Sequence, residues 1–354
     1  MTRVCDKQGM RNINVSTILR VFLSQEIVSQ TELVNSTGLK KATVSNIVNS
    51  LKKERLLTEA GEGTSGSSGG RKQQLLSINK TSVIAFGSAL RGFTLKSCLL
   101  NLKGEILWSN ESEFDENHSS KWLPVLIKDI RSAKELLKKS HVFIGVGFSA
   151  GGVYDPVTQA FMQFSHQEGG RVEKNVPVKS IIEKEFPGDR ITTDDFPNAM
   201  AIGEFMFGSA KNLDDFVLLQ LANLKAAIVS NKTIFRGFGG YAGQVGGWRY
   251  GDQILRLALL NGGYTTELLT DFCTNILIGY APEKIILSRE NIPEKISVDI
   301  PEINRRLKER FSEYGFSEYI KEPVAISTLG KEERASGAAA LVFDSYFNSN
   351  MLLM

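Results

Sequence analysis

Residues 40–49 carry a dense set of hydrogen-bonding and cationic side chains. Apolar residues recur among them at i, i+3, i+4 and i+7: Val44, Ile47, Val48 and Leu51. That spacing predicts a helix from about Lys40 to Glu54 with one apolar side. The opposite side has no carboxylate before Glu54 and holds Lys40, Lys41, Thr43, Ser45, Asn46 and Asn49. Short polar side chains can reach base edges and lysines neutralise phosphates, so this side is a candidate DNA-binding surface.

Two further helices are expected before this one. Apolar residues at helical spacing predict the first: Val15, Ile18, Leu19 and Phe22. Ser29 and Glu32 match the capping box that starts a helix, and Gly38 stands where a helix ends in a left-handed residue. A short helix, a glycine turn and an amphipathic helix form the helix-turn-helix pattern. A three-helix bundle without a ligand is the alternative.

A glycine-rich stretch from Gly61 to Gly70 follows and is continued by Arg71 and Lys72. Apolar residues flank it, with Leu56 and Leu57 before it and Leu75 to Ile78 after it. This arrangement predicts a β-hairpin wing whose tip reaches phosphates or a minor groove. The DNA-contact candidates of the tip are Gly69, Gly70, Arg71 and Lys72. A flexible linker is the alternative reading of the composition.

The charge distribution supports a polyanionic partner. The 354 residues carry a formal net charge of +3, but residues 1–80 hold 12 Lys and Arg against 6 Asp and Glu. The rest of the chain is therefore slightly acidic. A basic module on an acidic body is typical of nucleic-acid binding. A solvated basic face is the alternative.

Composition excludes several other classes of protein. The hydrophobic share of 42% and the charged share of 23% are ordinary for a globular protein. The three cysteines are widely spaced, which excludes a disulfide framework and CxxC zinc sites and fits a reducing cytoplasm. The chain lacks a run of 18 apolar residues, and its N-terminus is polar. We expect a cytoplasmic protein without a membrane span, cofactor or metal.

Strands and helices alternate after residue 80. Strands are predicted at 83–89, 95–102, 104–108, 141–149, 216–221 and 284–288, with a small-residue loop at 150–152. Helices are predicted at 121–139, 178–186, 199–208, 266–280, 303–311 and 331–346. This alternation indicates an α/β body whose sheets are covered by helices.

Several segments together resemble the ROK family (repressors, open reading frames and sugar kinases) of the NagC/XylR type. The N-terminal part is similar to the DNA-binding half of its repressors at 28–33, 37–39, 42–45 and 69–71. The body is similar to its motifs at Gly145–Asp155, Asn175–Val178, Asn198–Glu204, Gly240–Gly246, Pro282–Leu287 and Ser327–Ala339. The order and spacing of these segments make the resemblance specific, and it covers nearly the whole chain.

The resemblance implies a winged helix-turn-helix followed by a two-lobed, actin-like sugar-kinase fold. The implied domains are a DNA-binding domain at 1–80, a first lobe at 81–197 plus 331–354, and a second lobe with a dimerisation surface at 198–330. It also implies that the two lobes hinge around a sugar cleft.

The sequence departs from the catalytic members of the family at three motifs. The resemblance places Phe196 at the catalytic Asp, and a phenyl ring cannot accept a proton, although a slip in register would bring Asp194 or Asp195 there. The two phosphate loops fall on residues 89–93 and 222–226, which no longer match. The second includes Lys225, expected to be a solvated edge charge, with anion binding as the alternative. Gln244 and Gly247 replace the Glu and His of the sugar and zinc signature, so zinc is not expected.

The residues that remain for an effector lie around the implied cleft: Gly151, Gly152, Asp195, Asn198 and Gln244. Gln244 keeps an acceptor but lacks the charge of Glu, which favours a sugar phosphate or an acidic sugar over a plain hexose.

We therefore expect a transcriptional regulator with a catalytically inactive body, a repressor of carbohydrate-metabolism genes. As a homodimer or higher homo-oligomer it would bind double-stranded operator DNA with an inverted repeat. Two alternatives stay open. One is a regulator controlled by a protein partner without a small effector, and the other is an active sugar kinase that uses Asp194 or Asp195 as its base.

Overall fold

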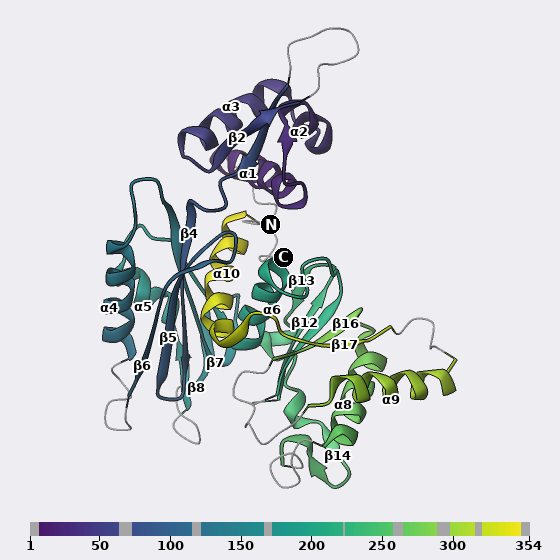
Figure 1. Ribbon diagram of the computed structural model, residues 1–354. Coiled ribbons are helices and arrows are strands. Elements are labelled where there is room, and N and C mark those ends of the chain that lie inside the picture. The colour runs from purple at the N-terminus through teal and green to yellow at the C-terminus, as the bar shows by residue number, and fades with distance from the viewer. Residues whose placement is uncertain are drawn as a thin grey trace.

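The computed structural model describes residues 7–63, 73–114, 122–165, 172–221, 224–257, 265–288, 298–315 and 321–347. Its first part, which we call the winged module, contains α1 Lys7–Ser24, β1 Val28–Ser29, α2 Gln30–Thr37, α3 Lys41–Lys53, β2 Leu57–Glu62 and β3 Gln74–Ile78. The strands form one antiparallel sheet in the order β1-β3-β2. The module stands at one end of the molecule, above a larger α/β body (Figure 1).

Local capping places α2 as expected. The backbone N–H of Glu32 donates to Ser29 Oγ over 3.2 Å, and the N–H of Ser29 donates to Glu32 Oε2 over 2.7 Å. Gly38 ends the helix with a φ of +67°, a conformation that costs glycine little. The capping box and the glycine C-cap are thus both confirmed.

The body begins with a seven-stranded sheet that defines the first lobe. Its strands are β4 Val83–Arg91, β5 Thr94–Asn101, β6 Ile106–Glu113, β7 Val142–Asp155, β8 Ala160–Ser165, β9 Val172–Val176 and β10 Ile191–Asp195. The order is β6-β5-β4-β7-β8-β9, and β10 pairs in parallel with the first part of β7. Helices α4 Trp122–Glu135 and α5 Val178–Glu185 share an apolar core with the sheet. In Figure 1 they cover its outer face.

A second, five-stranded sheet defines the second lobe. Its strands follow the order β13 Thr233–Phe235, β12 Lys225–Ser230, β11 Phe216–Gln220, β16 Lys284–Ser288 and β17 Val324–Ile326. Helices α8 Thr266–Tyr280 and α9 Ile300–Glu313 pack on the sheet through one apolar core. The connection before α8 contains the short strands β14 Arg249–Tyr250 and β15 Gln253–Ile254.

Two helices, α6 Phe196–Phe207 and α10 Glu333–Phe347, lie between the sheets (Figure 1). Both share an apolar core with β11 and β16 of the second sheet, while α10 also packs on the first sheet. Two glycines permit this close packing. A Cβ at Gly147 would lie 1.8 Å from the carbonyl oxygen of Ala338, and one at Gly337 would lie 2.6 Å from that of Ala199.

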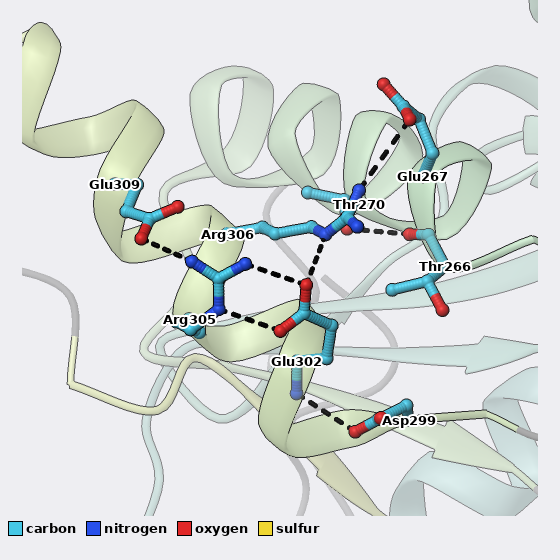
Figure 2. A network of polar contacts seen from close by, with 8 residues as sticks. All are labelled: Thr266, Glu267, Thr270, Asp299, Glu302, Arg305, Arg306 and Glu309. Atoms are coloured by element: carbon cyan, nitrogen blue, oxygen red, sulfur yellow. Dashed lines mark hydrogen bonds and ion pairs between the residues drawn. The ribbon is translucent and has the colours of Figure 1, made fainter.

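An exposed polar network ties α9 to α8 (Figure 2). Glu302 accepts from Arg305 and from Arg306, each over 2.7 Å, and Arg306 also reaches Glu267 of α8 at 3.6 Å. Asp299 caps α9 by accepting from the N–H of Glu302. The Arg305 side chain is 55% exposed, so its ion pairs contribute little individually.

The winged module and the first lobe share one apolar core. It joins Phe22 and Leu51 of the module to Leu100 of β5 and Phe343 of α10. A polar contact accompanies it, since Arg55 of the module donates to the carbonyl oxygen of Lys139 in the first lobe.

The predicted fold class is confirmed, but some local predictions were wrong. The expected loop at 150–152 is the interior of β7, because β8 pairs with this part of the strand. The helix expected at 121–139 is shorter and ends at Glu135. The predicted division at 197/198 lies within α6, and the division of the body into lobes stays a prediction. In the part of the chain that is described, each helix is too short or too polar to cross a membrane.

Candidate functional site

Helix α3 buries its apolar residues and presents its polar ones. Val44, Ile47, Val48 and Leu51 are all buried in the core of the winged module. On the other face, Lys40, Lys41, Asn46 and Asn49 are exposed, and Thr43 and Ser45 are half-buried. This face carries no carboxylate between residues 40 and 53, so the helix offers a phosphate only donors and cations.

Two contacts with neighbouring elements determine which cations are exposed beside α3. Arg11 of α1, which sequence reasoning did not single out, donates to Ser50 Oγ over 3.2 Å and adds an exposed cation. Lys52 is engaged instead with Glu59 of β2, at 2.6 Å. The sequence carries no signal for either contact, because each joins two elements.

The hairpin expected for the wing is present. Leu57 pairs with Ile78, Glu62 pairs with Gln74, and the N–H of Gly63 donates to the carbonyl oxygen of Gln73 over 2.8 Å. The four tip candidates lie outside the described residues: Gly69, Gly70, Arg71 and Lys72.

A second group of polar residues lies where the two lobes meet. Asp194 and Asp195 end β10, and Asp195 caps α6 by accepting from the N–H of Asn198 over 3.2 Å. The Asn198 side chain donates to Asp194 Oδ1 over 3.1 Å. Both carboxylates are buried. Burial and the neighbouring Asp194 together raise the pKa of Asp195 to about 6.

Arg236 crosses from the second lobe to Asp194. It directly follows β13, and its two terminal nitrogens donate to both carboxylate oxygens, over 2.9 and 2.5 Å. Nearby, Thr193 donates to the hydroxyl of Tyr154 over 3.0 Å, and burial raises the pKa of Tyr154 to about 12. The bidentate geometry makes the Arg236 pair a strong and directional contact.

Lys225 makes a second contact between the lobes. It opens β12, and its Nζ donates to the carbonyl oxygen of Gly152 on β7. Burial lowers the pKa of Lys225, while the charge of Asp195 acts in the opposite direction. The expectation of a solvated edge charge was therefore wrong, because β12 faces the first lobe at this point.

The effector candidates are only partly brought together. Hydrogen bonds and charge connect Gly152, Asp195 and Asn198 through Lys225 and Asp194. Gly151 pairs with Ser165 in the sheet, and Gln244 precedes a turn at 245–247. Within the described ranges, no hydrogen bond joins Gly151 or Gln244 to the other three.

Phe196 lies in the apolar core between the sheets rather than beside the two carboxylates. It is 2% exposed, and the Arg334 guanidinium stands 5.2 Å from the centre of its ring. Of the two segments aligned with phosphate loops, residues 91–94 form the β4–β5 turn, whereas 222 and 223 lie outside the described residues.

A sequence model described as ROK family matches residues 91–254. The xylose repressor of Bacillus spizizenii is 26% identical over 98% of this chain and 98% of its own. That of Bacillus subtilis is 25% identical with the same coverage of both chains.

Solved structures agree in fold. The crystal structure of a ROK family transcriptional regulator, a homologue of the E. coli MLC protein, superposes with a TM-score of 0.75 at 17% identity. It covers 96% of this chain and 97% of its own. A ROK family glucokinase from Streptomyces griseus, solved with glucose and AMPPNP, has a TM-score of 0.53 at 16% identity over 73% of this chain and 98% of its own.

Proposed function

We propose that this chain, whose residues 91–254 match the ROK family model and which resembles xylose repressors along nearly its whole length, is a DNA-binding transcriptional repressor of the NagC/XylR type whose body responds to a sugar. The observation that carries the proposal is the exposed face of α3, which offers cations and hydrogen-bonding groups without a carboxylate.

In the proposed complex, α3 enters the major groove. Thr43, Ser45 and Asn46 contact base edges, while Lys40 and Lys41 contact phosphates. Asn49 lies one turn further along the same face, and the wing tip adds Arg71 and Lys72 beside Gly69 and Gly70. Two copies in a homodimer would read half-sites about 34 Å apart, or a multiple of that spacing.

The proposed effector is an uncharged sugar, and xylose is the first to test because two relatives are xylose repressors. Gly152, Asp195 and Asn198 supply acceptors and donors for hydroxyl groups. Asp194 and Asp195 stand against Arg236 and Lys225, and Arg256 also acts on Lys225 through its positive charge.

The same contacts support a body without kinase activity. A kinase needs a carboxylate positioned to take a proton from a sugar hydroxyl. Asp194 is held by both nitrogens of Arg236, and Asp195 caps α6 beside Lys225. The Arg236 pair therefore removes Asp194 as a candidate for that base.

Selection of bound fragments from genomic DNA tests the proposal directly. The purified full-length protein at roughly physiological salt should recover an inverted repeat, since specific and non-specific binding separate under these conditions. Added xylose should then release the recovered fragment. Absence of binding even at low salt would reject DNA binding as the function.

A further inference from the structure

Two cations of the second lobe bond directly to the first lobe. Lys225 Nζ donates to the carbonyl oxygen of Gly152 on β7, and Arg236 donates to both oxygens of Asp194 on β10. Since β7 and β10 are neighbouring parallel strands, the two contacts lie beside each other. Both add to the apolar contacts through α6 and α10, which lie between the sheets.

The two contacts differ in strength. The Arg236 pair is bidentate and charged on both sides, with donor–acceptor distances of 2.9 and 2.5 Å. Lys225 instead bonds a neutral carbonyl, and Asp195 acts on it through charge. Lys225 is therefore the more easily displaced of the two cations.

Lys225 also occupies an acceptor that the proposed effector needs. The Gly152 carbonyl is one of the groups to which sugar hydroxyls would donate, and the ammonium is bonded to it, while Asp195 acts on the ammonium through charge. A sugar hydroxyl and Lys225 cannot both use this carbonyl in the same way. An ammonium that loses its partners inside a protein needs a new partner or water, because an unpaired buried charge is costly.

We propose that Lys225 is a latch that joins the two lobes in the sugar-free protein and is released when a sugar takes its acceptor. The proposal rests on the proposed function, because it concerns the regulation of the same site. Release of Lys225 lets the second lobe move relative to the first. Because the winged module shares its core with the first lobe, this motion also changes the position of the module relative to the second lobe.

The test measures lobe separation in the full-length protein with two spin labels. Lys103, in the β5–β6 turn, and Lys308, on α9, are exposed and take the labels as Lys103→Cys and Lys308→Cys. Cys5 is replaced by Ser, while Cys98 and Cys273 are buried and unlabelled. Pulsed electron paramagnetic resonance then compares three backgrounds: unchanged, Lys225→Met, and the control Lys232→Met. Lys232 lies between β12 and β13 and pairs with Asp214 of its own lobe at 2.9 Å.

Without sugar, the unchanged protein and Lys232→Met should give the same narrow distance distribution. Lys225→Met should give a broadened or shifted one, because methionine keeps the length of the side chain but cannot donate. If Lys225→Met fails to fold, Asp195→Asn serves in its place, since it removes the charge beside Lys225 and keeps a capping side chain for α6. Identical distributions in every folded variant would overturn the latch.

Binding of xylose provides the second readout. Loss of the latch should tighten xylose binding about tenfold, within the usual range of couplings between two states of a protein. Unchanged or weaker binding by Lys225→Met would overturn the latch, since Lys225 would then be a bystander or a sugar contact. Failure of the unchanged protein to bind xylose or DNA would instead count against the proposed function, while the distances without sugar still judge the latch.

Discussion

The exposed residues at α3 fall into two chemical classes. Removing a residue of each class should weaken DNA binding in a different way. In the proposed complex, Lys40 is a flexible cation that would contact phosphates, whereas Asn46 has a planar amide that would pair with a base edge. The lysine would then act on any DNA sequence and the asparagine on particular bases.

We expect Lys40→Ala to weaken binding uniformly across DNA sequences and to reduce the slope of log affinity against log salt by about one. Asn46→Ala should keep that slope, lose about 1–3 kcal/mol on the preferred site and bind altered sites nearly as well. Fluorescence anisotropy on matched and mismatched duplexes in graded salt measures both effects. Lys103→Ala, in the β5–β6 turn of the first lobe, serves as control, and a Lys40 variant that equals it would place the DNA surface elsewhere.

Asp129 is a carboxylic acid buried within the first lobe. It lies on α4 and is 3% exposed, and Asn110 donates to its Oδ1 over 3.0 Å. Burial raises the pKa of Asp129 above that of an exposed carboxyl group. The folded protein therefore binds this proton more tightly than the unfolded chain does.

The contribution of Asp129 to stability is full below about pH 4, the ordinary pKa of Asp, and is lost as the pH rises through the higher folded pKa. Asp129→Asn keeps an acceptor for Asn110 and carries no charge. We expect it to be more stable than the unchanged protein at pH 7 in urea unfolding, and to lose that advantage at pH 4. The control Asp214→Asn, at an exposed residue, should change the free energy of unfolding by less than about 0.5 kcal/mol. A destabilised Asp129→Asn protein at pH 7 would show that the charge is required.

At the scale of elements, the capping box sets where α2 begins. Ser29→Ala removes the acceptor of the Glu32 N–H and should destabilise the protein by about 1 kcal/mol. The free energy of DNA binding should change by less than the free energy of unfolding, because Ser29 is buried and is not among the exposed polar residues of α3. Urea unfolding measures the loss, and Ser36→Ala on the exposed side of α2 is the control. Equal stability of the two variants would contradict a role for the cap.

The elements that could be predicted from the sequence are those that local rules specify. The helical spacing of Val44 to Leu51, the capping box and the buried run at 142–149 all led to the right elements. The continuation of β7 through Gly152 was missed, because small residues alone resemble a loop. Only the pairing of this segment with β8 makes it a strand.

At the scale of the whole molecule, the shared core predicts that damage to α10 spreads to the winged module. Phe343 is fully buried in that core, and Phe343→Ala should cost about 3–5 kcal/mol. Amide hydrogen exchange should accelerate in α1 to α3 as well as in the first sheet.

Phe311→Ala removes the same side chain from α9, within the separate core of the second lobe, and is the matched control. Its exchange should accelerate in α8 and α9 while α1 to α3 stay protected. Protection of α1 to α3 in the Phe343→Ala protein would mean that the module folds independently of the body.

The polar residues between the lobes could be predicted from the sequence only in part. Asp195, Asn198 and Gly152 were among the candidates, yet Arg236 was absent from them and Lys225 was misjudged. Asp194 and Arg236 are 42 residues apart, and they meet because β10 and β13 end at the junction of two different sheets. A pairing of this kind leaves no pattern in the chain.

The sequence by itself determined the winged module, the α/β body and the acid-free face of α3. These follow from local periodicity, capping and charge, which act over a few residues. Only the tertiary structure decided that Phe196 is buried, that Asp194 is held by Arg236 and that Lys225 bridges to Gly152. Burial and ion pairing depend on which distant elements pack together, and that is set by the folded arrangement of both sheets around α6 and α10.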